Sequence, residues 1–199
     1  MSRFIETIRA ENGVIQHLEL HQTRMSRTLR DHGISAIPDL AARIENTSIQ
    51  LSGRVRIRIE YDTAGHLHIE QFRYMRKEIR SIRLMHISPT DYRYKYADRA
   101  WINALMKNSH ADEILMIRDG LVTDASIANI VFFDGSDWWT PDTPLLKGTE
   151  RSRLLEMGII QERRISFLDF SDYLGFRLIN AMLPWEDDIT YDIAIINQH

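Results

Sequence analysis

The stretch Asp112–Ile130 reads D-E-I-L-M-I-R-D-G-L-V-T-D-A-S-I-A-N-I and decides how the middle of the chain folds. The apolar run Glu113–Arg118 predicts a strand, the following D-G pair predicts a tight turn, and Leu121–Thr123 predicts the returning strand. A third strand is expected over Ile127–Phe133, ended by another D-G pair. This strand series places the carboxylate of Asp124 at a strand end.

Hairpins and short helices are expected on both sides of this stretch. Before it, the alternation of apolar and polar residues predicts strands at 4–10, 14–15, 55–61, 66–70 and 82–87. Helices are predicted at 18–32, from Pro38 to 44, at 98–108 and at 149–157, and short strands near 159–165 and 176–181. Because hairpins prevail over regular strand–helix–strand units, we expect an α+β fold in two lobes.

The polar, tyrosine-rich stretch from Thr90 to Tyr96 is the expected junction between the lobes. The division predicts an N-terminal α/β lobe over residues 1–89 and a C-terminal lobe over residues 90–199 that carries the lysine and the site discussed below.

The composition excludes several classes of protein. The 199 residues are 44% hydrophobic and 27% charged, which is typical of globular domains. No apolar window is long enough for a membrane span, and Glu6 and Glu11 argue against a secretory signal, so a cytoplasmic protein is expected. The absence of cysteine excludes disulfides, thiolate metal sites and cysteine nucleophiles. A net charge of −3 argues against a nucleic-acid partner.

Two histidine pairs and a stripe of alternate arginines are further candidate binding sites. His17 and His21 lie four residues apart on a predicted helix, but no third ligand is visible, so a surface or capping role is favoured and no metal is predicted. His66 and His68 are interpreted in the same way. Alternate arginines at 54, 56 and 58 predict a solvated strand face rather than a nucleic-acid surface, because no aromatic platform interrupts them.

Lysine is scarce, so any lysine chemistry must use Lys77, Lys95, Lys107 or Lys147. Lys95 lies in Y-R-Y-K-Y-A-D-R, Asp124 follows at a strand end, and Thr143–Arg151 then forms a glycine-containing turn that opens a helix. A Schiff-base lysine, an acid for a ring nitrogen and a helix N-terminus for a phosphate are the parts that a pyridoxal 5'-phosphate (PLP) site needs.

Four blocks in this order resemble a known family. They are F-I-E-T-I-R at Phe4–Arg9, H-Q-T-R-M within Leu20–Met25, the Asp112–Ile130 run, and the P-L-L-K-G-T-E-R turn at Pro144–Arg151. Together they resemble the class IV aminotransferases, or fold type IV PLP enzymes, which include branched-chain and D-amino acid aminotransferases and aminodeoxychorismate lyase. The resemblance runs from Phe4 to about Pro184. It implies a two-lobed, D-amino acid aminotransferase-like fold, shortened before Phe4, and a homodimer.

The resemblance also implies roles for single residues. Lys95 would form the Schiff base and then move the proton at the substrate α-carbon, and burial beside the cationic ring should lower its pKa. Asp124 stands where the family usually has Glu, paired with the pyridine nitrogen. Because Asp is one methylene shorter, the backbone approaches more closely, a water bridges the gap, or activity is weakened. Arg24 would bind the cofactor phosphate, and Gly148 and Thr149 would present N–H groups to it at a helix N-terminus. Asn129 is a further implied cofactor contact. Glu150 should point away from the phosphate.

The substrate is left open between two reactions. N-A-M-L-P at Asn180–Pro184 resembles a segment common in aminodeoxychorismate lyases, which release pyruvate and 4-aminobenzoate for folate synthesis, but a packed strand explains it equally well. An amino acid aminotransferase shares the early steps. A non-catalytic relative that binds a ligand is the third hypothesis. Arg93, Arg99 and Asn180 are the candidate substrate contacts.

Overall fold

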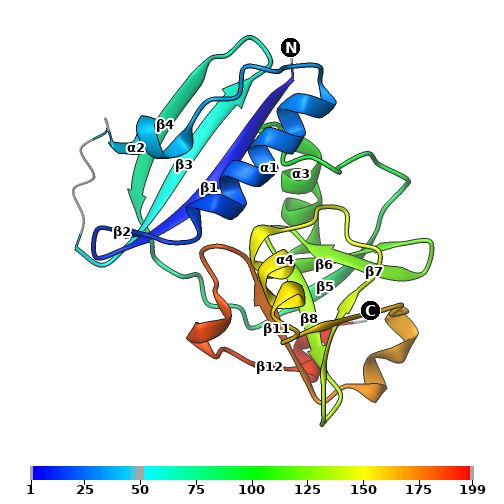
Figure 1. The fold of residues 1–199 in the computed structure, drawn as a ribbon. Coiled ribbons are helices and arrows are strands. Elements are labelled where there is room, and N and C mark those ends of the chain that lie inside the picture. The colour runs from blue at the N-terminus through cyan, green and yellow to red at the C-terminus, as the bar shows by residue number, and fades with distance from the viewer. Residues whose placement is uncertain (1, 46, 48–51, 198–199) are drawn as a thin grey trace. The chain divides into compact units, whose positions relative to one another are not determined.

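The protein is described by a computed structural model that covers residues 2–45, 47 and 52–197 (Figure 1). The chain divides into two compact units, Met1–Arg76 with Tyr94–Asp98, and Lys77–Arg93 with Arg99–His199. In this division the short segment that carries Lys95 belongs with the first unit. The lobe boundary expected between residues 89 and 90 stays a prediction, and each unit is described separately below.

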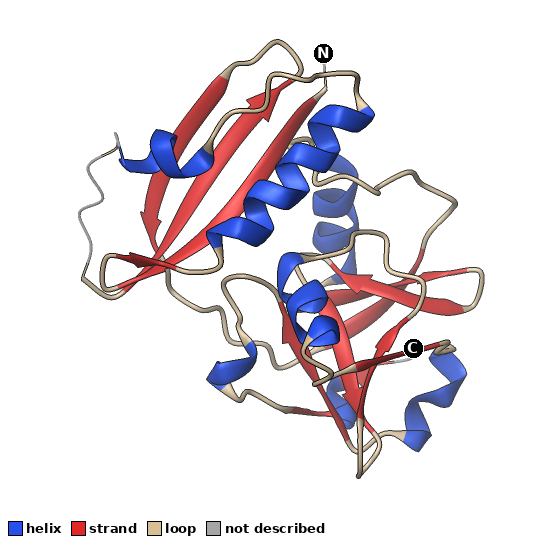
Figure 2. Cartoon of the chain, viewed as in Figure 1, coloured by secondary structure: helices blue, strands red, loops and turns tan. Residues whose placement is uncertain are grey.

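The first unit is an antiparallel sheet with helices on one face (Figure 2). The strands are β1 (Arg3–Glu11), β2 (Val14–Ile15), β3 (Arg54–Asp62) and β4 (Leu67–Arg73), in the order β2-β1-β3-β4. Helices α1 (Leu18–Asp31) and α2 (Leu40–Glu45) follow the first hairpin. The predicted strands and the first helix are confirmed within a few residues.

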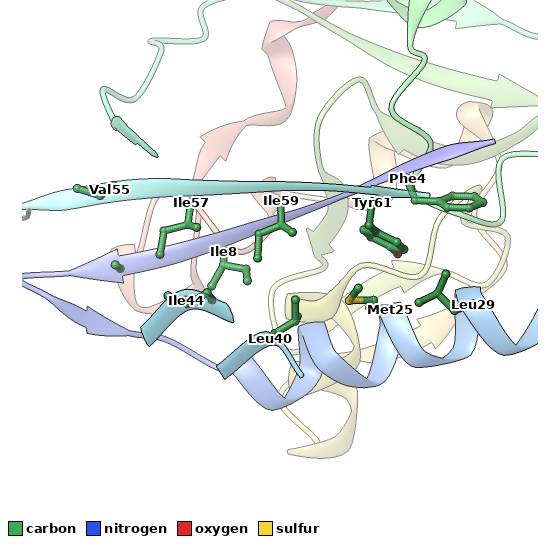
Figure 3. Packing of buried hydrophobic residues seen from close by; sticks show 11 residues of the cluster. Phe4, Ile8, Met25, Leu29, Leu40, Ile44, Val55, Ile57, Ile59 and Tyr61 are labelled. Carbon is green, nitrogen blue, oxygen red and sulfur yellow. The ribbon is translucent and has the colours of Figure 1, made fainter. Parts of the chain in front are cut away.

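The core of this unit follows the two-residue period of its strands. Figure 3 shows the alternate side chains of β1 and β3 packed against the apolar sides of the two helices. Its main members are Phe4, Ile8, Met25, Leu29, Leu40, Ile44, Val55, Ile57, Ile59 and Tyr61. Glu6 lies on β1 between Phe4 and Ile8 and is fully buried. The apolar side of the sheet therefore encloses one charged residue.

Lys95 is placed by backbone pairing with β1. The Ile5 N–H donates to the Lys95 carbonyl at 2.9 Å, and the Ala97 N–H donates to the Arg3 carbonyl at 2.8 Å. Phe4 and Tyr96 form an antiparallel bridge between these two bonds, with their rings 5.4 Å apart. The position of the Lys95 backbone is therefore set by the strand that carries Glu6.

The second unit contains two sheets. One has the order β13-β5-β6-β7, in which the parallel strands β5 (Ile82–His86) and β6 (Glu113–Arg118) are connected through α3 (Ala100–Ser109). The other has the order β10-β9-β8-β11-β12. The remaining elements are β7 (Leu121–Ala125), β8 (Asn129–Phe133), β9 (Trp138–Pro141), α4 (Thr149–Glu156), β10 (Gln161–Arg163), β11 (Gly175–Ile179), β12 (Tyr191–Asp192), β13 (Ile196–Asn197) and 3-10 helices at Phe167–Asp172, Trp185–Asp187 and Ile193–Ile195.

The mixed α and β architecture is confirmed, and the predicted starts of two helices need correction. The second helix begins at Leu40 rather than Pro38, because the Asp39 carboxylate accepts the N–H groups of Ala41 and Ala42 and so marks the helix start. The third helix begins at Ala100 rather than 98. Strand β9 was not predicted, since its four residues include Pro141 and two tryptophans without clear alternation.

Among the residues that the structure describes, no helix is both long and apolar enough to cross a lipid bilayer.

Candidate active site

In the second unit, the buried carboxylate of Asp124 is held by uncharged donors. Asp124 lies on β7, and only 5% of its surface is exposed. Its Oδ1 accepts a hydrogen bond from Asn129 Nδ2 at 2.6 Å, and its Oδ2 accepts one from the Leu146 N–H at 2.9 Å. Each carboxylate oxygen has capacity for a further donor. The group is therefore oriented, and it can accept one more N–H.

The pKa of Asp124 is raised to about 6. Burial is the largest cause, because it disfavours the charged form. The bonds from Leu146 and Asn129, the charge of Arg151 and a backbone bond from Leu145 lower the pKa and offset burial only in part. A cationic N–H beside this carboxylate would favour its charged form.

A glycine turn leads from this carboxylate into α4. The Gly148 N–H donates to Asn129 Oδ1 at 3.1 Å, and a Cβ on Gly148 would come within 2.2 Å of the same oxygen. Because Asn129 takes the Gly148 N–H, an anion at this helix end would be bound by the amides of Thr149 and Glu150, which begin the helix without intrahelical acceptors. The N–H groups expected to bind a phosphate at this turn are therefore those of Thr149 and Glu150 rather than that of Gly148.

The side chain of Glu150 is bonded to Arg153 and to the backbone of Trp185, and its orientation relative to a phosphate stays a prediction. Its carboxylate accepts Nε and Nη2 of Arg153 at 2.9 and 2.8 Å and the Trp185 N–H at 2.9 Å. The negative charge next to Thr149 is thus neutralised by an arginine one turn along the helix.

Arg151 is a residue of this site to which the sequence reasoning assigned no role. It is 2% exposed, its Nη2 donates to the Pro141 carbonyl at 3.0 Å and to Glu162 at 2.6 Å, and its charge lowers the pKa of Asp124. The signal was present, because the glycine turn is followed by an arginine in the quoted motif.

In the first unit, Glu6 is held by two side chains of α1. Arg24 donates through Nε to Glu6 Oε1 at 2.9 Å and through Nη2 to Oε2, while His21 Nδ1 lies 2.7 Å from Oε2. All three residues are buried. Arg24 was predicted to bind a phosphate, and that role stays a prediction. Since Glu6 takes the Nε side of the guanidinium, a phosphate would have to approach the Nη1 side.

The pKa values of Glu6 and His21 in this cluster are both lowered. Burial would raise the pKa of Glu6, but the charge of Arg24 and the bonds from His21 and Arg24 outweigh it and lower the pKa to about 2. Burial lowers the pKa of His21, and the charges of Arg24 and Lys95 act in the same direction against the opposing effect of Glu6. The cluster therefore contains a charged pair and a neutral imidazole at pH 7, and it lies within the electrostatic reach of Lys95.

The predicted substrate contacts have other roles in the structure. Arg93 is exposed and donates through Nε to Asp91 at 2.9 Å. Arg99 donates to the Ser126 carbonyl, in the loop after Asp124. Asn180 donates to the Ile127 carbonyl at 2.9 Å and accepts the Met182 and Leu183 amides at 2.8 and 2.9 Å. These bonds organise loops, and contact with substrate stays a prediction for all three residues.

One interpretation of a histidine was wrong. His21 is a buried partner of Glu6 rather than a surface residue, whereas His17 precedes α1 in a left-handed backbone conformation. The arginines at 54, 56 and 58 lie on the face of β3 opposite the core and are partly exposed. Arg54 pairs with Glu11 and Arg58 with Glu60 and Glu70, while Arg56 stacks on Phe72 and keeps a buried Nε that makes no hydrogen bond.

Across the described part of the chain, no three His, Asp or Glu side chains are grouped as metal ligands. His66, one of the second pair, pairs instead with Asp62 at 2.9 Å.

Comparison with known proteins identifies relatives over nearly the whole chain. The family model of amino-transferase class IV matches residues 3–185. An uncharacterised protein of Haemophilus influenzae is 41% identical over 186 residues, which is 92% of this chain and 98% of the relative. A crystal structure from Haemophilus somnus 129PT, provisionally named a 4-amino-4-deoxychorismate lyase, is 36% identical with a TM-score of 0.84 and covers 92% of this chain and 98% of its own.

A more distant structure has the same fold. The PLP-bound form of a hypothetical aminotransferase from Mycobacterium tuberculosis is 17% identical with a TM-score of 0.78, and the match covers 98% of this chain and 81% of that one.

Proposed function

The chain belongs to the amino-transferase class IV family, and from that premise we propose that it is a PLP-dependent lyase that converts aminodeoxychorismate into 4-aminobenzoate and pyruvate. The family is one of PLP enzymes, and the Haemophilus somnus relative carries the lyase name provisionally. An amino acid aminotransferase of the branched-chain or D-amino acid type is the alternative, because the M. tuberculosis structure of the same fold is named an aminotransferase.

The observation that carries the proposal is the environment of Asp124. This buried carboxylate has neutral donors and a pKa raised to about 6, and no cationic hydrogen-bond partner of it occurs among the described residues of its own unit. A protonated pyridine nitrogen supplies such a partner. The residues therefore fit PLP, and they hold its ring in the protonated form through charge pairing.

Lys95 supplies the proton transfer that the chemistry of this group needs. When bound, PLP supplies an electron sink for the carbanion that forms beside the substrate amine. The amine of Lys95 holds and moves the proton at the substrate carbon that bears the amino group, and for that it must be neutral part of the time. The positive charge of Arg24 is one of the factors that lower the pKa of its neighbour His21, and Lys95 adds to that field.

The phosphate is assigned to two groups of donors. The first amides of α4, at Thr149 and Glu150, present N–H groups at the positive end of the helix dipole. The Arg24 guanidinium adds a charged donor on the side not taken by Glu6, as its planar shape allows. The Leu146 and Asn129 bonds fix the orientation of the Asp124 carboxylate, which is shorter than the usual Glu.

The cofactor assignment is tested by trapping. The purified protein with added PLP should develop the yellow absorbance of a lysine-bound cofactor, and borohydride reduction followed by peptide mapping should place the label on Lys95. Lys77, Lys107 and Lys147 are the internal controls. A colourless protein, or a label on any of these three, would contradict the assignment.

A requirement for a second substrate distinguishes the transaminase from the lyase. Elimination converts aminodeoxychorismate into 4-aminobenzoate and pyruvate with no other reactant, whereas transamination needs a keto acid to accept the amino group. We expect pyruvate to appear from aminodeoxychorismate alone. A strict requirement for a keto acid would favour the aminotransferase, and no turnover with either substrate despite bound PLP would favour a ligand-binding relative.

A homodimer in the cytoplasm, without nucleic acid or membrane partners, completes the proposal. Sedimentation at working concentrations should give the mass of a dimer, and a monomer would count against this part of it.

A further inference from the structure

Both hydrogens and the oxygen of the Asn129 side-chain amide form hydrogen bonds within the second unit. One Nδ2 hydrogen is donated to Asp124 Oδ1 at 2.6 Å and the other to the Leu146 carbonyl at 2.9 Å. Its Oδ1 accepts the Gly148 N–H at 3.1 Å. A primary amide has two hydrogens to donate. Asn129 therefore has no hydrogen left to donate to a cofactor.

The same bonds fix the carboxylate of Asp124. Asn129 holds one carboxylate oxygen, and the Leu146 N–H holds the other. Because Asn129 also binds the Leu146 carbonyl, both polar groups of Leu146 are tied to this pair of side chains. The plane of the carboxylate and the path of the chain at Leu146 are therefore set together.

The close fit at Gly148 ties the start of α4 to the same amide. A Cβ at position 148 would lie 2.2 Å from Asn129 Oδ1, although the backbone angles of Gly148, φ −68° and ψ 152°, are open to any residue. Glycine is thus required here by the approach of Asn129 and not by backbone conformation. Any shift of Asn129 moves the amides that open the helix.

We propose that Asn129 is a positioning residue that holds the Asp124 carboxylate and the Gly148–Thr149 turn in one arrangement, so that binding of the ring nitrogen and binding of the phosphate depend on each other. This inference rests on the proposed PLP chemistry for its functional meaning. Its structural content, the coupling of two segments through one amide, is independent of any ligand.

The first test is Asn129→Ala, with Asn103→Ala on the exposed side of α3 as the matched control. In the protein without ligand, hydrogen exchange at the Leu146 and Gly148 amides should accelerate by about tenfold or more, as expected for a lost buried hydrogen bond. Affinities for PLP and for pyridoxal, which lacks the phosphate, are measured by absorbance. The pyridoxal affinity should fall about tenfold, and the ratio of PLP to pyridoxal affinity should fall as well.

The second test is a double-mutant cycle with Gly148→Ala. In the wild-type background the new methyl group meets Asn129 Oδ1, whereas in the Asn129→Ala background that oxygen is gone. Gly148→Ala should therefore lower PLP affinity and the midpoint of urea unfolding strongly in the first background and only slightly in the second. Equal losses in both backgrounds would overturn the inference.

The outcomes distinguish this inference from the function on which it rests. Unchanged exchange and unchanged affinities in Asn129→Ala would sink the positioning role while PLP binding by the wild type stands. A loss of PLP affinity without a loss of pyridoxal affinity would make Asn129 a phosphate contact and also overturn the inference. If the wild type binds no PLP, the proposed function fails, while the exchange rates and the unfolding cycle still decide the coupling.

Discussion

Glu6 in the first unit and Asp124 in the second are both removed from water, yet their pKa values move in opposite directions. The pKa of Glu6 falls to about 2, and that of Asp124 rises to about 6. Burial acts in the same sense on both, so the difference comes from their partners. Glu6 contacts the Arg24 guanidinium through two bonds, whereas Asp124 contacts an amide side chain and a backbone N–H.

The two buried acids differ in whether the chain gives them a cationic hydrogen-bond partner. Glu6 accepts hydrogen bonds from Arg24 and lies beside His21, so its charge has a cationic partner within its own unit. Asp124 is oriented but not neutralised, because Arg151 acts on it only through its field and donates its hydrogen bonds elsewhere. A buried carboxylate in this state marks a place where a cation is expected to bind.

The largest expected effect is on the stability of the first cluster. Glu6→Ala leaves Arg24 buried without its carboxylate, and we expect a loss of about 3–5 kcal/mol in the free energy of unfolding. Glu6→Gln keeps the shape and should lose less. Urea unfolding monitored by circular dichroism measures both. A loss below about 1 kcal/mol for Glu6→Ala would show that Arg24 finds another partner and would remove the contrast.

The corresponding change in the second unit should affect activity more than stability. With the lyase assay above, Asp124→Ala should lower kcat by about a hundredfold to a thousandfold, the range seen when one preorganised electrostatic group is removed. Its free energy of unfolding at pH 7.5 should change by only about 1 kcal/mol, because relief of the buried charge offsets two lost hydrogen bonds. A variant that unfolds as readily as Glu6→Ala would give Asp124 a structural role instead.

The pH dependence of stability should have opposite signs for the two acids. The folded-state pKa of Asp124 lies above its ordinary 3.8, so its contribution is fully present below pH 3.8 and is lost as the pH rises through about 6. The difference corresponds to about 3 kcal/mol. For Glu6, the contribution is present above pH 4.5 and is lost as the pH falls through about 2.

The contribution of Asp124 is isolated by comparing the free energies of unfolding of the wild type and Asp124→Ala, both without cofactor, between about pH 4 and about pH 7.5. The wild type should lose stability relative to the variant as the pH rises. Saturating PLP should abolish this difference, because the ring nitrogen stabilises the charged carboxylate. Parallel curves for the two proteins would mean that Asp124 is charged throughout and has found a cation within the chain.

The smallest expected effect is at an exposed ion pair on the same sheet as Glu6. Arg3 and Glu60 lie 2.7 Å apart, but 67% of the Arg3 side chain is exposed. Arg3→Ala should therefore change the free energy of unfolding by about 0.2–1 kcal/mol, and added salt should shrink the change. A loss comparable with that of Glu6→Ala would show that burial is not what separates the two pairs.

Much of the fold followed from patterns that are local in the chain. The alternation in Val55–Tyr61 predicts a strand with one buried face, and the turn residues around it predict the hairpin, because both depend on neighbouring residues alone. The start of the second helix was misplaced, because a capping bond from Asp39 competes with the preference of Pro38 for the first turn.

For the candidate site, the sequence predicted some residues and missed a contact between others. The motifs led to Lys95, Asp124 and the glycine turn, since each residue type is tied to a chemical role. They did not reveal that His21 and Glu6 are partners, because residues 15 apart in the chain meet only when the helix packs on the strand.

By itself, the sequence indicated the family, most of the longer strands and helices and the few residues that can carry lysine chemistry, because these depend on residue type and spacing. Only the tertiary structure decided the state of the charges. Glu6 and Asp124 look alike in the sequence, and the folded chain gives one an arginine and the other only neutral donors. The pKa of a buried acid depends on desolvation and on the groups within a few ångströms, and folding alone brings those groups together.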